Sequence, residues 1–250
     1  MNCFHRFIED FEGGVFEHAL LPGPIRSAIC FEMPPLEQMS DLKEIPELMR
    51  PPYEICWFEG QGIGGNGKEG RICFLLLSDG DHIALGMYEY MSFSGPGGGF
   101  YEIENALYEN GQWKCHPHAS RFVQSLRLQI GENVLKPNLA YVSKFLSLLN
   151  CKNIGRVETK PSDDHQRRRR KQGRVPLFSY WTLVLKPTAP AKSKGQGDSH
   201  ASPRLHLRRG HIRRLSEDRH VWVQACVVGN KERGIVHKDY AMPRAADTVQ

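Results

Sequence analysis

Arginine and histidine side chains crowd the stretch from residue 204 to residue 222, which also holds one tryptophan. Arginine grips phosphate through two parallel hydrogen bonds, histidine moves protons near neutral pH, and the Trp222 ring can stack on a base. These residue types suit nucleic-acid binding, or RNA cleavage without a metal, in which histidine is the base and arginine stabilises charge on the phosphate. The candidate catalytic residues are His206, Arg209, His211 and Arg213.

A second basic cluster, Arg167-Arg168-Arg169-Arg170-Lys171, comes earlier in the chain. Ser162 is a good helix N-cap, the two aspartates after it suit the positive end of a helix, and Gly173 is placed to end one. The pattern predicts a short exposed helix that carries the arginines. Across both clusters, the candidate nucleic-acid-binding residues are Arg167, Arg168, Arg169, Arg170, Lys171, Arg208, Arg209, Arg213, Arg214 and Trp222.

Residues 203–229 are predicted to form a hairpin, with strands at 204–215 and 220–229. Side chains alternate between the two faces of a strand, so we expect His206 and His211 on opposite faces, unable to share a metal ion. Basic residues fall on both faces. The alternative to a binding site is a solvated edge hairpin, whose charges prevent aggregation or pair with acidic residues of the same chain.

The chain is electrically divided. Residues 1–150 carry 11 Lys and Arg against 19 Asp and Glu, whereas residues 151–250 carry 22 against 9, and the net charge of +5 hides this contrast. We expect an acidic, sheet-rich region over residues 1–150 and a basic region over residues 151–250, either as two regions or within one compact domain. Such a division indicates a polyanionic or acidic partner.

The acidic region is predicted to be an antiparallel sheet with helices at its margins, and the fold class α+β. Strand-like runs occupy residues 53–59, 71–77, 82–91, 100–108 and 112–115, with Asn110-Gly111 as a hairpin turn between the last two. Apolar residues at helical spacing predict helices over residues 4–11 and 137–150. A further strand is expected at residues 177–186. Only short helical pieces are expected between residues 22 and 52, where prolines are frequent.

Few residues match the patterns of a cofactor or metal site. Gly60, Gly62 and Gly65 satisfy G-x-G-x-x-G formally, but the next run is strand-like, whereas a dinucleotide-binding loop opens a helix. This loop is therefore interpreted as a hairpin connection. Cys115-His116-Pro117-His118 has no second pair of ligands at metal spacing. We expect no cofactor and no metal.

The cysteine pattern indicates a reducing compartment. The seven cysteines are odd in number and widely spaced, and no C-x-x-C pair occurs, which argues against a disulfide framework or a zinc ribbon. No apolar stretch approaches the roughly 18 residues of a membrane span, and residues 1–10 do not form a secretory signal. A cytoplasmic protein without membrane contact is expected.

Several motifs in the basic region carry a resemblance. They are Leu148-Leu149-Asn150-Cys151-Lys152-Asn153, the Arg/Lys-rich segment before Val175-Pro176-Leu177-Phe178-Ser179-Tyr180, Arg204-Leu205-His206 with Arg209-Gly210-His211-Ile212-Arg213, and Val221-Trp222-Val223. In this order they resemble a recurrent family of small bacteriophage and prophage proteins of unassigned function, over the chain from about residue 140 onward. The resemblance implies a phage-encoded protein in the cytoplasm of a bacterial host.

Charge, motifs and resemblance together predict a phage accessory protein that binds nucleic acid or a nucleoprotein through its basic C-terminal half. The residues favour a binding protein over an enzyme. Two alternatives stay open. One is a phage inhibitor of a host defence system, similar to an anti-CRISPR protein, that uses the acidic half to mimic nucleic acid against a host nucleic-acid-binding protein. The other is a metal-independent RNase.

Overall fold

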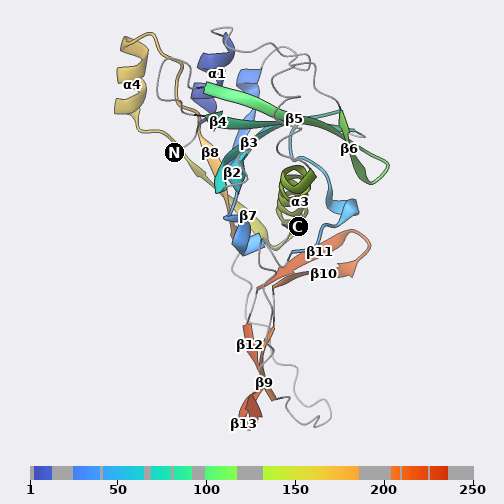
Figure 1. Cartoon of the computed structure of the whole chain (residues 1–250). Helices are drawn as coiled ribbons and strands as arrows, with labels where there is room; N and C mark the ends of the chain where they lie inside the picture. The colour runs from blue at the N-terminus through green and yellow to red at the C-terminus, as the bar shows by residue number, and fades with distance from the viewer. Residues whose placement is uncertain are drawn as a thin grey trace, which may run out of the picture.

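An eight-stranded sheet forms the body of the protein, in the strand order β6-β5-β4-β3-β2-β1-β8-β7 (Figure 1). The computed structural model describes residues 3–12, 25–39, 42–64, 69–79, 82–91, 99–116, 132–185, 204–208, 210–224 and 226–235. The strands of the sheet are β1 (Ile29–Glu32), β2 (Ile55–Ile63), β3 (Glu69–Ser78), β4 (Ile83–Met91), β5 (Gly99–Glu109), β6 (Gln112–His116), β7 (Ile154–Thr159) and β8 (Tyr180–Leu185). Together with the helices below, this confirms the α+β class.

The sheet differs from the expected antiparallel arrangement at β1, the third strand from the β7 edge. Strands β2 to β6 form an antiparallel meander, but β1 pairs in parallel with both β2 and β8. The expectation of a purely antiparallel sheet is therefore wrong at β1. Strands β7 and β8 come from the basic region, so the sheet takes strands from both sides of residue 150. Both β1 and β7 are absent from the sequence prediction, because β1 is four residues long and β7 is mostly exposed or half-buried.

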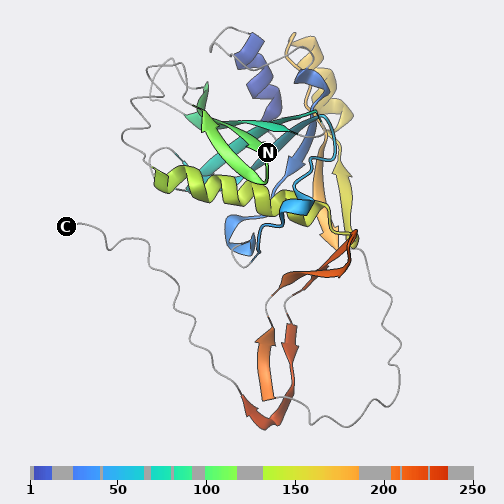
Figure 2. The same ribbon diagram turned by 90° about the vertical axis from the view of Figure 1, so that its right-hand side faces the viewer.

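Helices cover the two faces of the sheet (Figure 2). α3 (Glu132–Leu149) lies on one face, while α1 (Phe4–Glu12) and α4 (Asp163–Lys171) lie on the other. Side chains of β2 alternate between the two faces of the sheet, so this strand contributes to an apolar cluster on each face. Phe58 packs in the cluster with Phe145 of α3, and Trp57 packs in the cluster with Phe4 and Phe7 of α1. The predicted helix at residues 4–11 is confirmed. No described helix has the length and apolar character needed to cross a membrane.

Close contact with β2 fixes the position of α3. A Cβ on Gly60 would collide with the Tyr141 hydroxyl oxygen, and one on Gly62 would lie 2.6 Å from Asn138 Oδ1. The Asn138 side chain accepts from the Ile63 amide at 3.1 Å and donates to the Ile63 carbonyl at 2.7 Å. Two glycines of the G-x-G-x-x-G match therefore serve helix–sheet packing inside a strand. The helix itself begins five residues before Pro137, the expected start.

The C-terminal strands form two small sheets outside the main sheet, which we together call the ladder. These are β9 (Arg204–Arg208), β10 (His211–Ser216), β11 (Arg219–Val223), β12 (Cys226–Val228) and β13 (Asn230–Ile235). β10 pairs with β11 in one sheet and β9 pairs with β12 in the other, both antiparallel. β13 pairs irregularly with β9 in parallel. We call β10–β11 the hairpin and β9–β12–β13 the arm.

The arm stands clear of the body in both ribbon views, whereas the hairpin lies against the end of α3 (Figures 1 and 2). The remaining elements are short 3-10 helices: η1 (Ile25–Ser27), η2 (Leu36–Met39) and η3 (Pro46–Leu48). The last two confirm the short helical pieces expected in the proline-rich segment. Ser147 of α3 accepts the Ile45 amide at 3.0 Å, which ties the start of η3 to the helix.

Candidate nucleic-acid interface

The hairpin is fastened to the turn between α3 and β7. The Asn153 side chain donates to the Trp222 carbonyl at 2.7 Å and accepts from the Trp222 amide at 2.7 Å. One residue earlier, the Lys152 amide donates to the His220 carbonyl at 2.9 Å. Ile212 and Trp222 pack against the main core on the α3 face. The hairpin is thus held by polar backbone contacts and by an apolar contact at the same place.

Strand pairing determines which hairpin side chains share a face. The pairs Ile212↔Trp222 and Arg214↔His220 lie on one face, and His220 is only 5% exposed. The pair Arg213↔Val221 lies on the other face, away from the core contact. The expected position of Trp222 on the partner strand is correct. Its half-buried ring packs on the core, however, and is not presented as a platform on which a base could stack.

Four arginines on the ladder are exposed: Arg208, Arg213, Arg214 and Arg219. Within the described part of the chain, none of the four forms an ion pair with a carboxylate. Arg208 Nη2 lies 3.4 Å from His211 Nε2, and Arg214 Nε lies 3.4 Å from the Ser216 carbonyl oxygen. We call these four residues the ladder arginines. Arg219 was not among the sequence candidates, although it follows the hairpin turn directly.

The remaining candidates of this segment are only partly defined. The backbone of His206 lies on β9, opposite Val228, and the structure does not describe its side chain. Arg209 lies outside the described residues. A general base must lie within hydrogen-bond reach of the proton that it takes. Of the described histidine side chains on the ladder, His211 is half-buried beside Arg208, whereas His220 is buried on the opposite face.

The second basic cluster forms α4, as predicted. Ser162 is the N-cap and accepts from the His165 amide, and Gly173 adopts a φ of 64° after the helix. Arg169 is 12% exposed: its Nε donates to the Val175 carbonyl at 2.6 Å and its Nη2 to Glu9 Oε1 at 2.6 Å. It therefore docks α4 onto α1 and is not available to a ligand.

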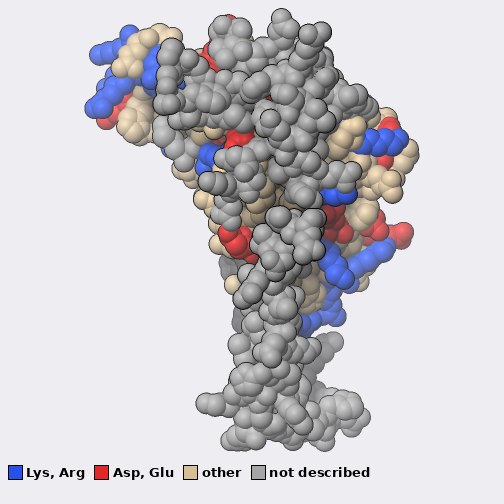
Figure 3. Space-filling model, viewed as in Figure 1, with Lys and Arg blue, Asp and Glu red and all other residues tan. Residues whose placement is uncertain are grey.

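Other cations of α4 remain on the surface. Arg167 pairs with Asp164 at 3.6 Å, and both side chains are well exposed. Arg168, Arg170 and Lys171 are also exposed. Basic side chains thus gather in two places, over α4 at the upper left and over the hairpin at the lower right, with the body between them (Figure 3). The structure does not join the two predicted basic clusters into one surface.

Glu9 is the acidic partner of α4. Arg174 also donates to it, from Nη2 to Oε2 at 3.2 Å. Burial by itself would raise the pKa of Glu9, but the hydrogen bond from Arg174 and the charges of Arg169 and Arg174 outweigh it and hold this pKa below its ordinary value. The carboxylate therefore stays ionised and keeps the two arginines in place.

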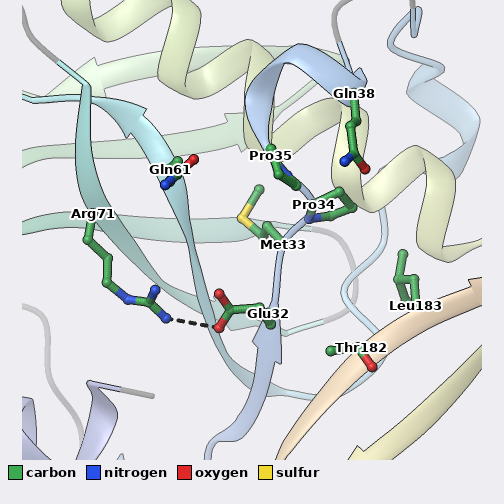
Figure 4. Close-up of a pocket in the computed structure, with 9 residues that line it drawn as sticks. All are labelled: Glu32, Met33, Pro34, Pro35, Gln38, Gln61, Arg71, Thr182 and Leu183. Atoms are coloured by element: carbon green, nitrogen blue, oxygen red, sulfur yellow. Dashed lines mark hydrogen bonds and ion pairs between the residues drawn. The ribbon is translucent and has the colours of Figure 1, made fainter. Parts of the chain in front are cut away.

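A pocket of about 410 Å³ opens at the end of β1, beside Gln61 of β2 and Thr182 and Leu183 of β8. It is lined by Glu32, Met33, Pro34, Pro35, Gln38, Gln61, Arg71, Thr182 and Leu183 (Figure 4). Arg71 donates to Glu32 at 2.9 Å and, through Nε and Nη2, to Glu59 at 3.0 and 2.5 Å.

Glu59 ties this pocket to α1. The same carboxylate accepts from the Cys3 and Phe4 amides at 2.7 and 3.0 Å and from Trp57 Nε1 at 2.8 Å. Burial raises the pKa of Glu59, while Arg71 and these donors oppose the rise. The charged groups of the pocket are thus committed to one another and to the start of α1. Their arrangement fixes the helix to the sheet.

The cysteine and histidine residues that the structure describes add no metal centre. Cys115 and His116 lie on β6, and residues 117–118 fall outside the description. Among the described residues, no group of three His, Cys, Asp or Glu side chains is placed to hold a metal ion. Burial raises the pKa of the Cys56 and Cys151 thiols to about 12, so both remain protonated and unreactive near neutral pH.

The candidate site is thus defined by the residues that it exposes. It consists of exposed guanidinium groups on a β-ladder, seated on the body by Asn153, with no described catalytic or metal constellation beside them. Comparison of the chain with protein-family models, with curated proteins and with solved structures gave no match.

Proposed function

We propose that this protein is an accessory protein of a bacteriophage or prophage that binds nucleic acid through the ladder arginines. The observation that carries the proposal is that Arg208, Arg213, Arg214 and Arg219 are exposed and unpaired with carboxylates in the described part of the chain. Guanidinium groups in this state can form bidentate hydrogen bonds with phosphate oxygens. The phage origin rests on the sequence resemblance alone.

The mode of attachment supports a binding role. Residues that seat the hairpin, Asn153, Ile212 and Trp222, are distinct from the arginines that face solvent. A ligand can therefore bind without disturbing the contacts that hold the hairpin. His211 and the buried His220 lie on opposite faces of the hairpin, so these two described histidines do not face one ligand together.

Salt dependence of binding tests the proposal. Each phosphate that is neutralised releases counterions, so log K for a duplex should fall with log salt by about 0.9 per phosphate contacted. The variant Arg213→Ala/Arg214→Ala/Arg219→Ala should weaken binding and reduce this slope by up to about three units. Fluorescence anisotropy with labelled oligonucleotides measures both quantities.

A matched control comes from α4. The variant Arg167→Ala/Arg168→Ala/Arg170→Ala removes the same number of exposed charges from the other basic surface and leaves Arg169 in place. It should retain most of the affinity and slope. If both variants lose affinity equally, the net charge of the protein alone accounts for binding, and the ladder arginines are not the binding site. Absence of binding to any nucleic acid at low salt would overturn the proposed function itself.

A further inference from the structure

A second pocket, of about 340 Å³, opens on the body between the β5–β6 hairpin and the segment that carries η3. β6 is the strand at one edge of the eight-stranded sheet (Figure 1). The side chains that matter here are two aromatic rings, one carboxylate and two apolar groups: Tyr108, Trp113, Glu44, Pro46 and Met49. The volume lies near the lower end of the range for ligand pockets, about 300–1,000 Å³, and therefore suits a small head group.

The two aromatic rings of this pocket are held at an angle to each other. Tyr108 and Trp113 are opposite residues of β5 and β6, with ring centroids 5.1 Å apart and ring planes inclined by 58°. Trp113 Nε1 donates to the Ser143 hydroxyl of α3 at 2.8 Å, and this hydroxyl donates to the Leu139 carbonyl at 2.8 Å. Because α3 uses the indole N–H, Trp113 offers the pocket ring surface and no hydrogen-bond donor.

Negative charge gathers at the same pocket. The Glu44 carboxylate forms no hydrogen bond or ion pair within the described part of the chain. Burial raises the pKa of Glu44, while the charge of Lys144 opposes the rise. Burial and, after it, the charges of Glu44 and Glu47 raise the pKa of Tyr108. Both carboxylates therefore act on a ring that lines the pocket, and a positive charge placed beside that ring would be stabilised.

We infer that this pocket binds a small organic cation with a quaternary ammonium group. The faces of Trp and Tyr rings attract such a cation, and a carboxylate beside them balances its charge. A metal ion or a primary ammonium group needs several polar partners when it leaves water. A quaternary ammonium group has no N–H donor, and its methyl groups can contact the rings and the Pro46 and Met49 side chains. The pocket shares no residue with the ladder arginines, so this inference is independent of nucleic-acid binding.

The test compares choline with 3,3-dimethylbutan-1-ol, which has the same shape and no charge. Two-dimensional NMR of the full chain follows the Trp113 indole N–H and the Met49 methyl group during each titration. Choline should shift both signals saturably and bind about tenfold more tightly than the neutral alcohol. Equal affinities would show that the pocket selects shape and not charge, and would overturn the inference. Absence of a saturable shift with choline would overturn it as well.

Variants assign the effect to the carboxylate and the ring. Glu44→Gln, a change at an exposed residue, and Tyr108→Leu should each weaken choline binding about two- to tenfold. Two matched controls should bind choline as the unaltered protein does. Tyr108→Phe keeps the ring and removes the hydroxyl, and Glu54→Gln removes an exposed carboxylate outside the pocket. Unchanged affinity in Glu44→Gln, or an equal loss in Glu54→Gln, would refute the role of this pocket.

Discussion

Asn153 pairs with both backbone polar groups of Trp222, at 2.7 Å in each direction. This contact joins the α3–β7 turn to the hairpin across 69 positions of sequence. The side-chain amide of Asn153 makes the two hydrogen bonds that a neighbouring strand would make, so it fixes the hairpin although no strand is paired there. The position of the ladder arginines relative to the body depends on it.

Replacement of Asn153 by alanine should loosen the hairpin. Two hydrogen bonds are lost and the Trp222 backbone groups are left partly buried, a change that costs about 1–3 kcal/mol. Amide hydrogen exchange should accelerate across β10 and β11 while β2 to β5 keep their protection. Gln224→Ala is the control, because this side chain is exposed at the end of β11. Unchanged exchange in Asn153→Ala would show that Ile212 and Trp222 hold the hairpin unaided.

The contact of Arg169 with Glu9 predicts an acid-sensitive docking of α4. The pKa of Glu9 is lowered in the folded protein, so its stabilising effect is present above its ordinary pKa and is lost as the pH falls through the lowered value. Arg169→Ala should release α4 and cost about 1.5–3 kcal/mol, the range for a hydrogen bond to a charged group. Hydrogen exchange in α4 as a function of pH measures the release.

Arg170→Ala is the control for this experiment, since Arg170 is exposed on the same helix. It should leave both the exchange rates and their pH dependence as in the unaltered protein. Arg169→Ala, in contrast, should remove the acid-sensitive step. If acid sensitivity persists in Arg169→Ala, Arg174 alone is sufficient to hold Glu9.

Close packing at Gly62 makes a sharper prediction. The added methyl group in Gly62→Ala would lie 2.6 Å from Asn138 Oδ1 and 2.9 Å from Ile72 Cγ1, both in the buried interface between α3 and the sheet. Overpacking of this kind costs roughly 1–3 kcal/mol. Gly70→Ala is the control, because its nearest contact is an ordinary 3.5 Å to Glu89. Chemical denaturation compares the two, and equal stability would contradict the close approach of α3.

Local signals predicted α4 well, and distant pairings were not predictable. The cap at Ser162 and the glycine at residue 173 are separated by one short helix, so neighbouring residues determine both ends. Strand β1, in contrast, is stabilised by β2 and by β8, which begins about 150 positions later. No local pattern in four residues among prolines identifies such a partner. The same reason explains why only short helical pieces, and no strand, were expected between residues 22 and 52.

In the candidate site, too, local features were predictable from the sequence and distant contacts were not. Arginine clusters are visible in the sequence, and most of them are exposed in the structure. Arg169 was grouped with the ligand-binding residues, because a run of arginines does not reveal which member meets a carboxylate 160 positions away. Asn153 was missed, since a single asparagine after a helix has no distinguishing pattern. Trp222 was recognised as important, but its packing against the core depends on the whole fold.

The buried pair of Glu59 and Arg71 gives the last prediction. The variant Arg71→Met leaves Glu59, which is 1% exposed, without its charged partner, and burial then opposes ionisation of its carboxyl group. A raised pKa in the folded state means that the folded protein binds a proton more readily than the unfolded chain, so stability is fully present at low pH and declines as the pH rises through that pKa. Arg71→Met should therefore be more stable near pH 5 than near pH 8.

Its partner variant should behave differently. Glu59→Gln removes the titrating group and leaves a guanidinium that still meets Glu32 at 2.9 Å, so its free energy of unfolding should change little between the same two pH values. Breaking a buried pair from one side costs about 3–5 kcal/mol, and both variants should show a loss of that order at neutral pH. Urea denaturation at several pH values measures both. A flat pH profile for Arg71→Met would show that the Cys3 and Phe4 amides and the Trp57 indole suffice to keep Glu59 ionised, and that α1 is anchored by hydrogen bonds to a permanent negative charge.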